Sequence, residues 1–333
     1  MKIFYLLSFF LFGTFSAVAQ DIHWSQFNDN PIFQNPANSG RFNGDYRIHG
    51  NYRDQWRSVT VPFSTFSFCG DTKFAKIPKL GLGALFFHDQ AGDGKFKTIE
   101  LQISPSYQMN LTSDSVHTLR AGLQIGINHR QVNMDKFSFD AQFDGTIYNP
   151  SLPTNETFQN QKNTNFSLGT GFVYEWFQGE RKRISGGLAL FNLNKPNQGF
   201  YGQAVQRDMR VNLFAKGQFE VNYDWDILPT FQLNFQGKYK EIILGASARY
   251  ILIDRLGEYR AVYFGAFYRN KDAGYLSVGM DYQNWFAGLS YDINFSKLMP
   301  ASNIRGGIEL SVRYIITRFN PKKVLHRVCP DYI

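Results

Sequence analysis

The sequence predicts an all-β protein, a transmembrane antiparallel β-barrel of the outer-membrane type. Aromatic residues make up 17% of the 333 residues, yet the mean hydropathy is −0.32, so the chain is rich in rings but polar on average. Apolar and polar residues alternate with a period of two over stretches of about 10 residues, the length of a tilted strand that crosses a bilayer. After the N-terminal residues, no apolar run reaches the roughly 18 residues that a transmembrane helix needs.

Residues 1–19 have the pattern of a secretory signal peptide. Lys2 supplies a positive charge, Phe4–Phe15 is almost wholly apolar, and Ala17-Val18-Ala19 offers a small-residue cleavage site. The alternative is an N-terminal membrane anchor, but the apolar run is too short for one. We therefore expect an exported protein.

Residues 20–44 are rich in Asn and Pro and do not read as a strand, because Pro lacks an N–H and restricts the residue before it. Asn side chains can pin turns through their own oxygens. We expect this segment in the periplasm or folded into the barrel lumen. The segment could be a plug or docking element, or it could pack under the barrel and stabilise it. The two roles are compatible. The candidate partner-binding residues are Asn30, Pro31, Asn35, Pro36 and Ala37.

Residues 45–319 predict a barrel of about fourteen strands, with the apolar face toward lipid and the Gln-, Asn- and Ser-rich face toward the lumen. Closure is required because every backbone N–H and C=O in lipid must be paired. The strands are expected to start near Asp45, Pro62, Lys79, Thr98, His117, Thr164, Arg183, Met209, Ile227, Glu241, Tyr259, Gly274, Trp285 and Gly306. With an even number of strands, the start of the first strand and the end of the last strand both lie on the periplasmic side.

The connections support this orientation, because the longer ones are odd-numbered and outer-membrane barrels carry their long loops outside. The longest, residues 131–163, holds more aromatic residues than an exposed loop usually does, which suggests a protein contact or inward packing. With residues 192–208 it is our candidate surface for a secreted adhesin domain. Its aromatic residues are Phe137, Phe139, Phe143, Tyr148 and Phe158.

Several charged and sulfur-bearing residues carry further expectations. The lumen-side residues Glu100, Arg120, Glu309 and Arg313 should form internal ion pairs that fill the barrel rather than line a conduction path. Cys69, expected near the periplasmic end of its strand, could form a disulfide with Cys329 in an oxidising compartment. Residues 320–333 form a basic tail that should face the periplasm, where Lys322, Lys323 and Arg327 could dock on an acidic partner or simply be solvated.

Five segments in order resemble the PorP/SprF family. The opening stretch 26–40 resembles its start, where a Gln–aromatic pair precedes Asn-Pro, Asn-Pro-Ala and a Gly. The family's Tyr-Arg-x-Gln-Trp is similar to Tyr52-Arg53-Asp54-Gln55-Trp56. Residues 187–196 resemble its Gly-x-Ala-x-x-His-Leu-x-x-Pro stretch, with Asn192 where His is commoner. Its closing strands resemble Leu289-Ser290-Tyr291-Asp292 and residues 307–311, with Gly307 where Ser or His often stands.

The resemblance implies an outer-membrane protein of the type IX secretion and gliding machinery of Bacteroidota, without enzymatic activity. PorP-like members associate with the periplasmic ring and a peptidoglycan-binding partner. SprF-like members deliver very large adhesins that carry a particular C-terminal domain. The long tail favours the SprF-like side. The implied partners are therefore an adhesin C-terminal domain, periplasmic ring or peptidoglycan-binding components, and outer-membrane lipid.

The motifs of metal sites and enzymes, and the distribution of charge, argue against other classes of protein. No two of the six His have metal-ligand spacing, and neither a G-x-S-x-G elbow nor a P-loop is present. We expect no cofactor, no metal and no enzyme. The net charge of +8 is spread along the chain except for the tail, so nucleic acid is not an expected partner. A porin or ligand channel, and a structural partner of the periplasmic ring, remain alternative functions.

Overall fold

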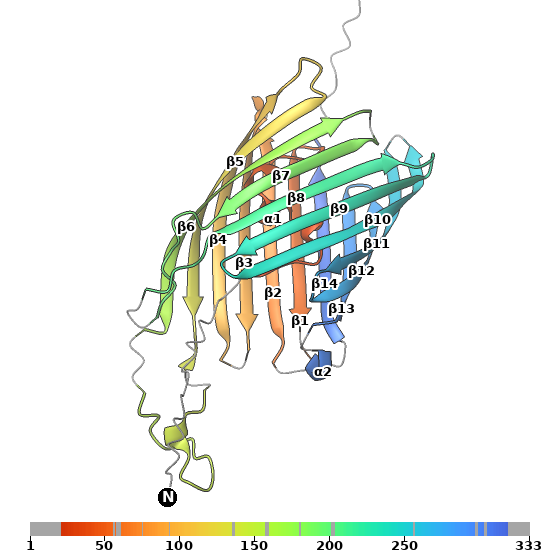
Figure 1. The fold of residues 1–333 in the computed structure, drawn as a ribbon. Coiled ribbons are helices and arrows are strands. Elements are labelled where there is room, and N and C mark those ends of the chain that lie inside the picture. Colours follow the sequence, from red (N-terminus) through yellow and green to blue (C-terminus); the bar gives the residue numbers. More distant parts are fainter. Residues whose placement is uncertain are drawn as a thin grey trace, which may run out of the picture.

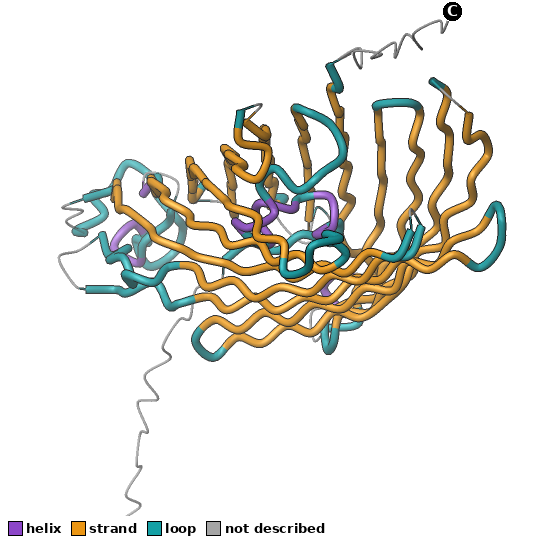
Figure 2. The backbone as a smooth tube through the Cα atoms, turned by 90° about the horizontal axis from the view of Figure 1, so that it is seen from above, coloured by secondary structure: helices purple, strands orange, loops and turns teal. Residues whose placement is uncertain are grey.

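The computed structural model describes residues 21–55, 57, 61–74, 76–92, 94–134, 137–156, 160–179, 181–200, 204–255, 257–296, 299–302 and 305–318. They form a closed antiparallel barrel in which each strand pairs with its neighbours in sequence and β1 pairs with β14. Figure 1 shows the barrel from the side and Figure 2 shows it from above. The strands are β1 Tyr46–Gln55, β2 Phe63–Phe74, β3 Ile77–Ala91, β4 Phe96–Asn110, β5 His117–Gln131, β6 Lys162–Phe177, β7 Arg183–Phe191, β8 Arg210–Glu220, β9 Trp225–Gln236, β10 Tyr239–Arg255, β11 Glu258–Arg269, β12 Ala273–Tyr282, β13 Trp285–Asn294 and β14 Arg305–Ile316.

The sequence prediction of the barrel is confirmed, including the strands at Arg183 and Tyr259 where both faces are apolar. Every expected start lies within two residues of an observed one. The described residues also include short helical turns: η1 Phe27–Asp29, α1 Pro31–Gln34, η2 Pro36–Asn38, η4 Asp140–Gln142 and α2 Met299–Ser302.

The polar face of the sheet is the buried one. On β5, the outward Leu123, Ile125 and Ile127 are 59%, 49% and 55% exposed, whereas the inward Gln124 and Asn128 are 4% and 2% exposed. A soluble sheet buries its apolar face, so this reversed pattern is that of a barrel whose outer face meets lipid. No helix in the described ranges is both long and apolar enough to cross a membrane.

The two ends of the barrel differ. We call the end that carries the odd-numbered connections the loop end, and the other the turn end. The loop end has the long β5–β6, β7–β8 and β13–β14 connections, and the β5–β6 loop extends well beyond the strands in Figure 1. The turn end has short connections, and there β1 begins and β14 ends. The longest connections lie at the loop end, as expected from the sequence, although the β9–β10 and β11–β12 turns at that end are short.

Candidate functional site

The segment Asp21–Gly44, here the N-terminal segment, runs through the lumen from the loop end to the turn end. At the loop end, the Asp21 backbone N–H donates to Gln236 Oε1 at 2.7 Å. At the turn end, the Gly40 N–H donates to Asp71 Oδ2 at 2.7 Å, and Arg41 pairs with Glu175 at 2.8 Å. Figure 2 shows its helical turns inside the ring of strands. Of the two expected locations, periplasm or lumen, the structure places residues 21–44 in the lumen.

Local sequence explains the conformation of this segment. Pro31 and Pro36 begin α1 and η2, where a missing N–H costs nothing. Asn35 accepts from the Ala37 N–H at 2.9 Å and so caps η2. Asn30 does not cap α1 with its side chain but donates to Ser67 Oγ of β2 at 2.8 Å. The two Asn-Pro pairs thus set two tight turns and also bind the barrel wall.

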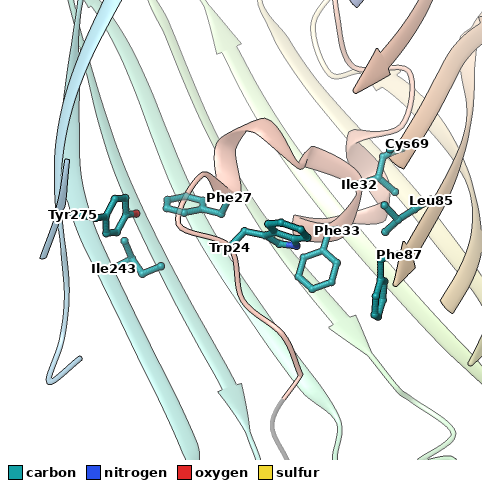
Figure 3. Close-up of a cluster of buried hydrophobic side chains, with 9 residues drawn as sticks. All are labelled: Trp24, Phe27, Ile32, Phe33, Cys69, Leu85, Phe87, Ile243 and Tyr275. Carbon is teal, nitrogen blue, oxygen red and sulfur yellow. The ribbon is translucent and has the colours of Figure 1, made fainter. Parts of the chain in front are cut away.

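An apolar cluster fixes the middle of the N-terminal segment (Figure 3). Trp24, Phe27, Ile32 and Phe33 are each at most 8% exposed and pack against wall residues. Trp24 and Phe87 both meet Phe33 edge to face, with ring centroids 6.4 and 6.1 Å away. The wall side of the cluster consists of Cys69, Leu85, Phe87, Ile243 and Tyr275. Burial of this many large side chains stabilises the seating of the segment.

A buried network of charges holds the segment beside this cluster. We call Ser25, Gln26, Arg53, Arg269, Asp292 and Glu309 the central cluster. The Ser25 and Gln26 N–H groups donate to the two Glu309 oxygens at 2.7 and 2.9 Å. Arg53 of β1 pairs with Asp292 at 2.8 Å and Glu309 at 3.1 Å. Ser25 Oγ donates to Asp292 Oδ1 at 2.7 Å and accepts from Arg53 and Arg269 at 2.8 and 2.7 Å.

The segments that resemble the PorP/SprF family meet in this cluster. Gln26 comes from the opening stretch, Arg53 from the Tyr-Arg-x-Gln-Trp match, and Asp292 and Glu309 from the two closing strands. The fifth segment binds the N-terminal segment on the other side of the barrel, where Asn35 Nδ2 donates to the Leu188 carbonyl at 3.1 Å. Residues that look unrelated along the chain therefore share one task, which is to hold the N-terminal segment in the barrel.

A second ionic site fixes Asp21 at the loop end. Its carboxylate, 11% exposed, lies 2.8 Å from Arg207 and 3.4 Å from Arg210. Burial alone raises the pKa of Asp21, but the two guanidinium groups outweigh it and lower the pKa to about 2. Arg207 also pairs with Glu100 at 3.1 Å and so ties the β7–β8 loop to β4.

Close backbone packing adds to the ion pairs toward the turn end of the segment. A Cβ built on Gly122 of β5 would lie 2.6 Å from the Ala37 Cα, and one on Gly171 of β6 would lie 2.9 Å from the Asn35 Cγ. These two glycines make room for the η2 backbone. Phe172 and Leu188 both accept from Asn35 Nδ2 at 3.1 Å.

The expected internal charges are mostly paired. Glu100 pairs with Arg207, Glu309 with Arg53, and Arg313 with Asp281 at 3.1 Å. The expectation of an ion pair is wrong for Arg120, which has no carboxylate within 4 Å among the described residues. Its guanidinium instead donates to the Ser39 carbonyl at 3.3 Å, because the folded segment presents backbone oxygen there.

The candidate loop residues lie at the loop end. Phe143 and Tyr148 form an antiparallel bridge and are 54% and 46% exposed, and Phe137 is 41% exposed. Phe139 precedes η4 and is half-buried. Phe158 lies outside the described residues, as do Lys322, Lys323, Arg327 and Cys329. The structure does not bring the loop residues into contact with Asn30, Asn35 or Ala37, which lie deeper in the lumen.

Cys69 lies near the middle of β2 rather than near its periplasmic end, and it is 1% exposed against the N-terminal segment. Its expected pairing with Cys329 stays a prediction. In the described part of the chain, no three His, Cys, Asp or Glu side chains gather closely enough to hold a metal ion.

Sequence reasoning missed the central cluster's Ser25, Arg269 and Asp292, and the Asp21 site. Gln26, Arg53 and Asp292 stood within motif segments and could have been singled out there. The charged partners of Ser25 and Gln26 lie more than 200 residues away along the chain, so sequence spacing held no signal for them.

Comparison with solved structures finds outer-membrane barrels with similar folds. The toluene transporter TbuX of Ralstonia pickettii superposes with a TM-score of 0.51 at 11% identity, covering 86% of this chain and 92% of its own. The monoaromatic hydrocarbon channel CymD gives 0.51 at 10% identity, covering 88% and 94%. A Pseudomonas aeruginosa FadL homologue gives 0.50 at 12% identity, covering 86% and 94%. At such identities the likeness shows the fold alone.

No curated protein sequence matches the chain. The sequence profile of the family described as "Type IX secretion system membrane protein PorP/SprF" matches residues 16–314, nearly the whole chain. Together with the closed barrel and its likeness to solved outer-membrane barrels, this match identifies an outer-membrane protein. The chain belongs to the PorP/SprF family of type IX secretion system membrane proteins.

Proposed function

We propose that the protein is a non-enzymatic component of the type IX secretion and gliding system that holds a secreted adhesin at the cell surface. Its loop end binds the C-terminal domain of the adhesin, and its turn end links to the periplasmic ring or to peptidoglycan-binding components. The proposal assigns the loop end to the outside, because outer-membrane barrels carry their long loops there.

The observation that carries this proposal is the occupied lumen. The N-terminal segment spans the lumen between Asp21 at one end and Arg41 at the other, and it is fixed by buried ion pairs as well as apolar packing. Separating the partners of a buried ion pair is strongly unfavourable, so we expect the N-terminal segment to remain in the lumen. A filled barrel favours a scaffold that binds macromolecules over a pore for free diffusion.

The exposed aromatic residues of the β5–β6 loop supply the proposed contact. Phe143, Ile147 and Tyr148 are 54%, 64% and 46% exposed on one bridged turn. Aromatic side chains that cluster at a surface are typical anchors of protein interfaces. The proposed periplasmic contact is the basic tail, residues 320–333, which follows the turn-end terminus of β14.

The test is a pull-down with matched double variants of the full chain in detergent. Phe143→Ser with Tyr148→Ser removes the proposed anchors, and we expect recovery of the adhesin C-terminal domain to fall about tenfold or more. Val221→Ser with Tyr223→Ser is the control, since these side chains are 65% and 83% exposed at the opposite end of the barrel. Equal recovery of the adhesin domain by both variants would reject the loop contact.

Truncation before residue 320 tests the periplasmic side. We expect the truncated chain to keep the adhesin domain but lose the ring components. A deletion strain that loses all type IX export, and not only adhesins, would favour a structural partner of the ring. Steady conductance of the intact protein in planar bilayers would favour a porin.

A further inference from the structure

A pocket of about 250 Å³ lies at the loop end, between Asp21–His23 of the N-terminal segment and the inner faces of β2 to β5. Four apolar side chains from four elements wall it: Ile22, Phe63, Phe87 and Phe96. Drug-sized ligand sites begin at about 300 Å³, so this pocket suits a single large side chain with one attached polar group. Apolar walls on several sides fit a bulky hydrophobic group better than a sugar ring, whose hydroxyl groups need polar partners around its edge.

Asn128 lines the pocket and carries a buried acceptor without a donor. The residue is 2% exposed, and its Nδ2 donates to Glu100 Oε2 at 2.7 Å. Its Oδ1 is buried and has no hydrogen-bond partner in the described part of the chain. A buried acceptor left unpaired is destabilising, and a ligand N–H that reaches it would remove this cost.

Arg130 gives the pocket donors without a carboxylate. Its guanidinium lies 4.9 Å from the centre of the Phe96 ring and bonds to Gln198 of the β7–β8 loop. No Asp or Glu lies within 4 Å of it among the described residues, whereas Arg207 beside it has both Asp21 and Glu100. A guanidinium has five N–H donors, so Arg130 can still bond to a carbonyl.

The other charges of the pocket disfavour an anion. Asp89 lines the pocket and its carboxylate accepts from Thr65 at 2.7 Å, and Asp21, which is paired with Arg207, also lines it. A ligand carboxylate would face both. A peptide group is neutral and offers one N–H and one C=O, which match Asn128 Oδ1 and Arg130.

The two long loops begin at the rim of this pocket. The Asn133 N–H donates to the Gly94 carbonyl at 3.2 Å, and the Phe137 ring covers Gly94. Phe200 of the β7–β8 loop meets Phe96 edge to face at 6.1 Å. A partner bound to the loops would therefore have the pocket beneath it.

We propose that this pocket binds a neutral peptide segment of the partner, with a bulky apolar side chain between Phe63, Phe87 and Phe96 and a peptide group between Asn128 and Arg130. This rests on the proposed function, since the partner is the protein that docks on the loops. It adds a defined recognition site and a substrate class to that surface.

Small probes test the pocket without the partner. N-acetyl-L-phenylalaninamide should give saturation-transfer NMR signals with the purified barrel, and N-acetyl-L-alaninamide and glucose should not displace it. Ala91→Phe fills the pocket from β3, and Asn128→Leu removes the acceptor. We expect each to weaken binding about tenfold or more. Phe177→Ala is the matched control, since Arg183 stacks on that ring at 4.9 Å near the turn end.

The outcomes separate the two proposals. Folding of each variant is checked by heat-modifiable migration of the barrel in electrophoresis. Binding of glucose in place of the phenylalanine probe, or equal binding by Ala91→Phe and Phe177→Ala, would overturn the pocket assignment. If the adhesin domain binds Ala91→Phe as well as it binds the unaltered chain, the pocket assignment falls while the loop contact stands. If the probe binds but no adhesin domain does, the proposed function falls.

Discussion

Ala37 lies directly against Gly122, and a Cβ at Gly122 would be 2.6 Å from the Ala37 Cα. The N-terminal segment and the β5 strand thus touch backbone to backbone. Such contact leaves no flexible side chain that could move aside. A substitution at this contact therefore tests whether the N-terminal segment occupies this position in the lumen.

Gly122→Ala should therefore disturb the seating of the N-terminal segment. We expect a loss of about 1–3 kcal/mol in the free energy of unfolding, the usual cost of overpacking. Urea titration in detergent followed by tryptophan fluorescence measures it. Gly50→Ala is the control, because the nearest atom to a Cβ there is 3.7 Å away. Equal losses in the free energy of unfolding for the two substitutions would show that the close approach of Gly122 to Ala37 does not affect stability.

Arg53→Met should be strongly destabilising because it leaves Asp292 and Glu309 buried without their common partner. Removing one member of a buried pair costs about 3–5 kcal/mol. Arg57→Met is the comparison, since Arg57 pairs with Asp54 but its side chain is 78% exposed, and exposed ion pairs contribute little to stability. A loss below 1 kcal/mol for Arg53→Met in the same titration would argue against an ionic anchor.

The Asp21 site should lose its stabilising effect in acid. Its pKa is lowered from 3.8 to about 2, so the stabilisation is present above pH 3.8 and is lost as the pH falls through 2. A shift of this size corresponds to about 2 kcal/mol. Asp21→Asn should be less stable than the unaltered chain by that amount at neutral pH, and the gap should close near pH 2. A gap independent of pH would contradict the assignment.

Replacing residues 21–42 with a Gly-Ser linker of equal length should open the barrel. The linker cannot supply the aromatic cluster or the ion pairs, so we expect ion conductance in planar bilayers where the unaltered chain shows none. Arg57→Met serves again as the folding control. If the linker variant folds correctly but shows no conductance, the side chains of the strands that face the lumen close it by themselves.

Cys69 should be unreactive in the folded protein because it is 1% exposed. We expect maleimide labelling of this thiol only after denaturation, measured by mass spectrometry. The predicted bridge to Cys329 is read in the same experiment without reductant. Two free thiols would discard the bridge, and a linked pair would mean that the tail reaches the lumen.

The strands could be predicted closely because the signal for them is local. Alternation over β5 or β13 records which side chains meet lipid, and it marks the strand without knowledge of its neighbours. The seating of the N-terminal segment could not be predicted, because it depends on pairs such as Ser25 with Asp292, 267 residues apart. The sequence allowed either the periplasm or the lumen for residues 20–44. It showed Arg120 as charged but could not show that Ser39 would offer it a carbonyl.

The contacts of Asn35 and Ala37 bear on how the barrel is assembled. The segment leads directly into β1, yet these residues bind β5, β6 and β7 about halfway round the ring. The Arg53–Asp292 pair joins β1 to β13, across the seam that β1 and β14 close. The N-terminal segment therefore links distant strands of the ring, and the Arg53–Asp292 pair fixes β1 and β13 on the two sides of the closing strand β14.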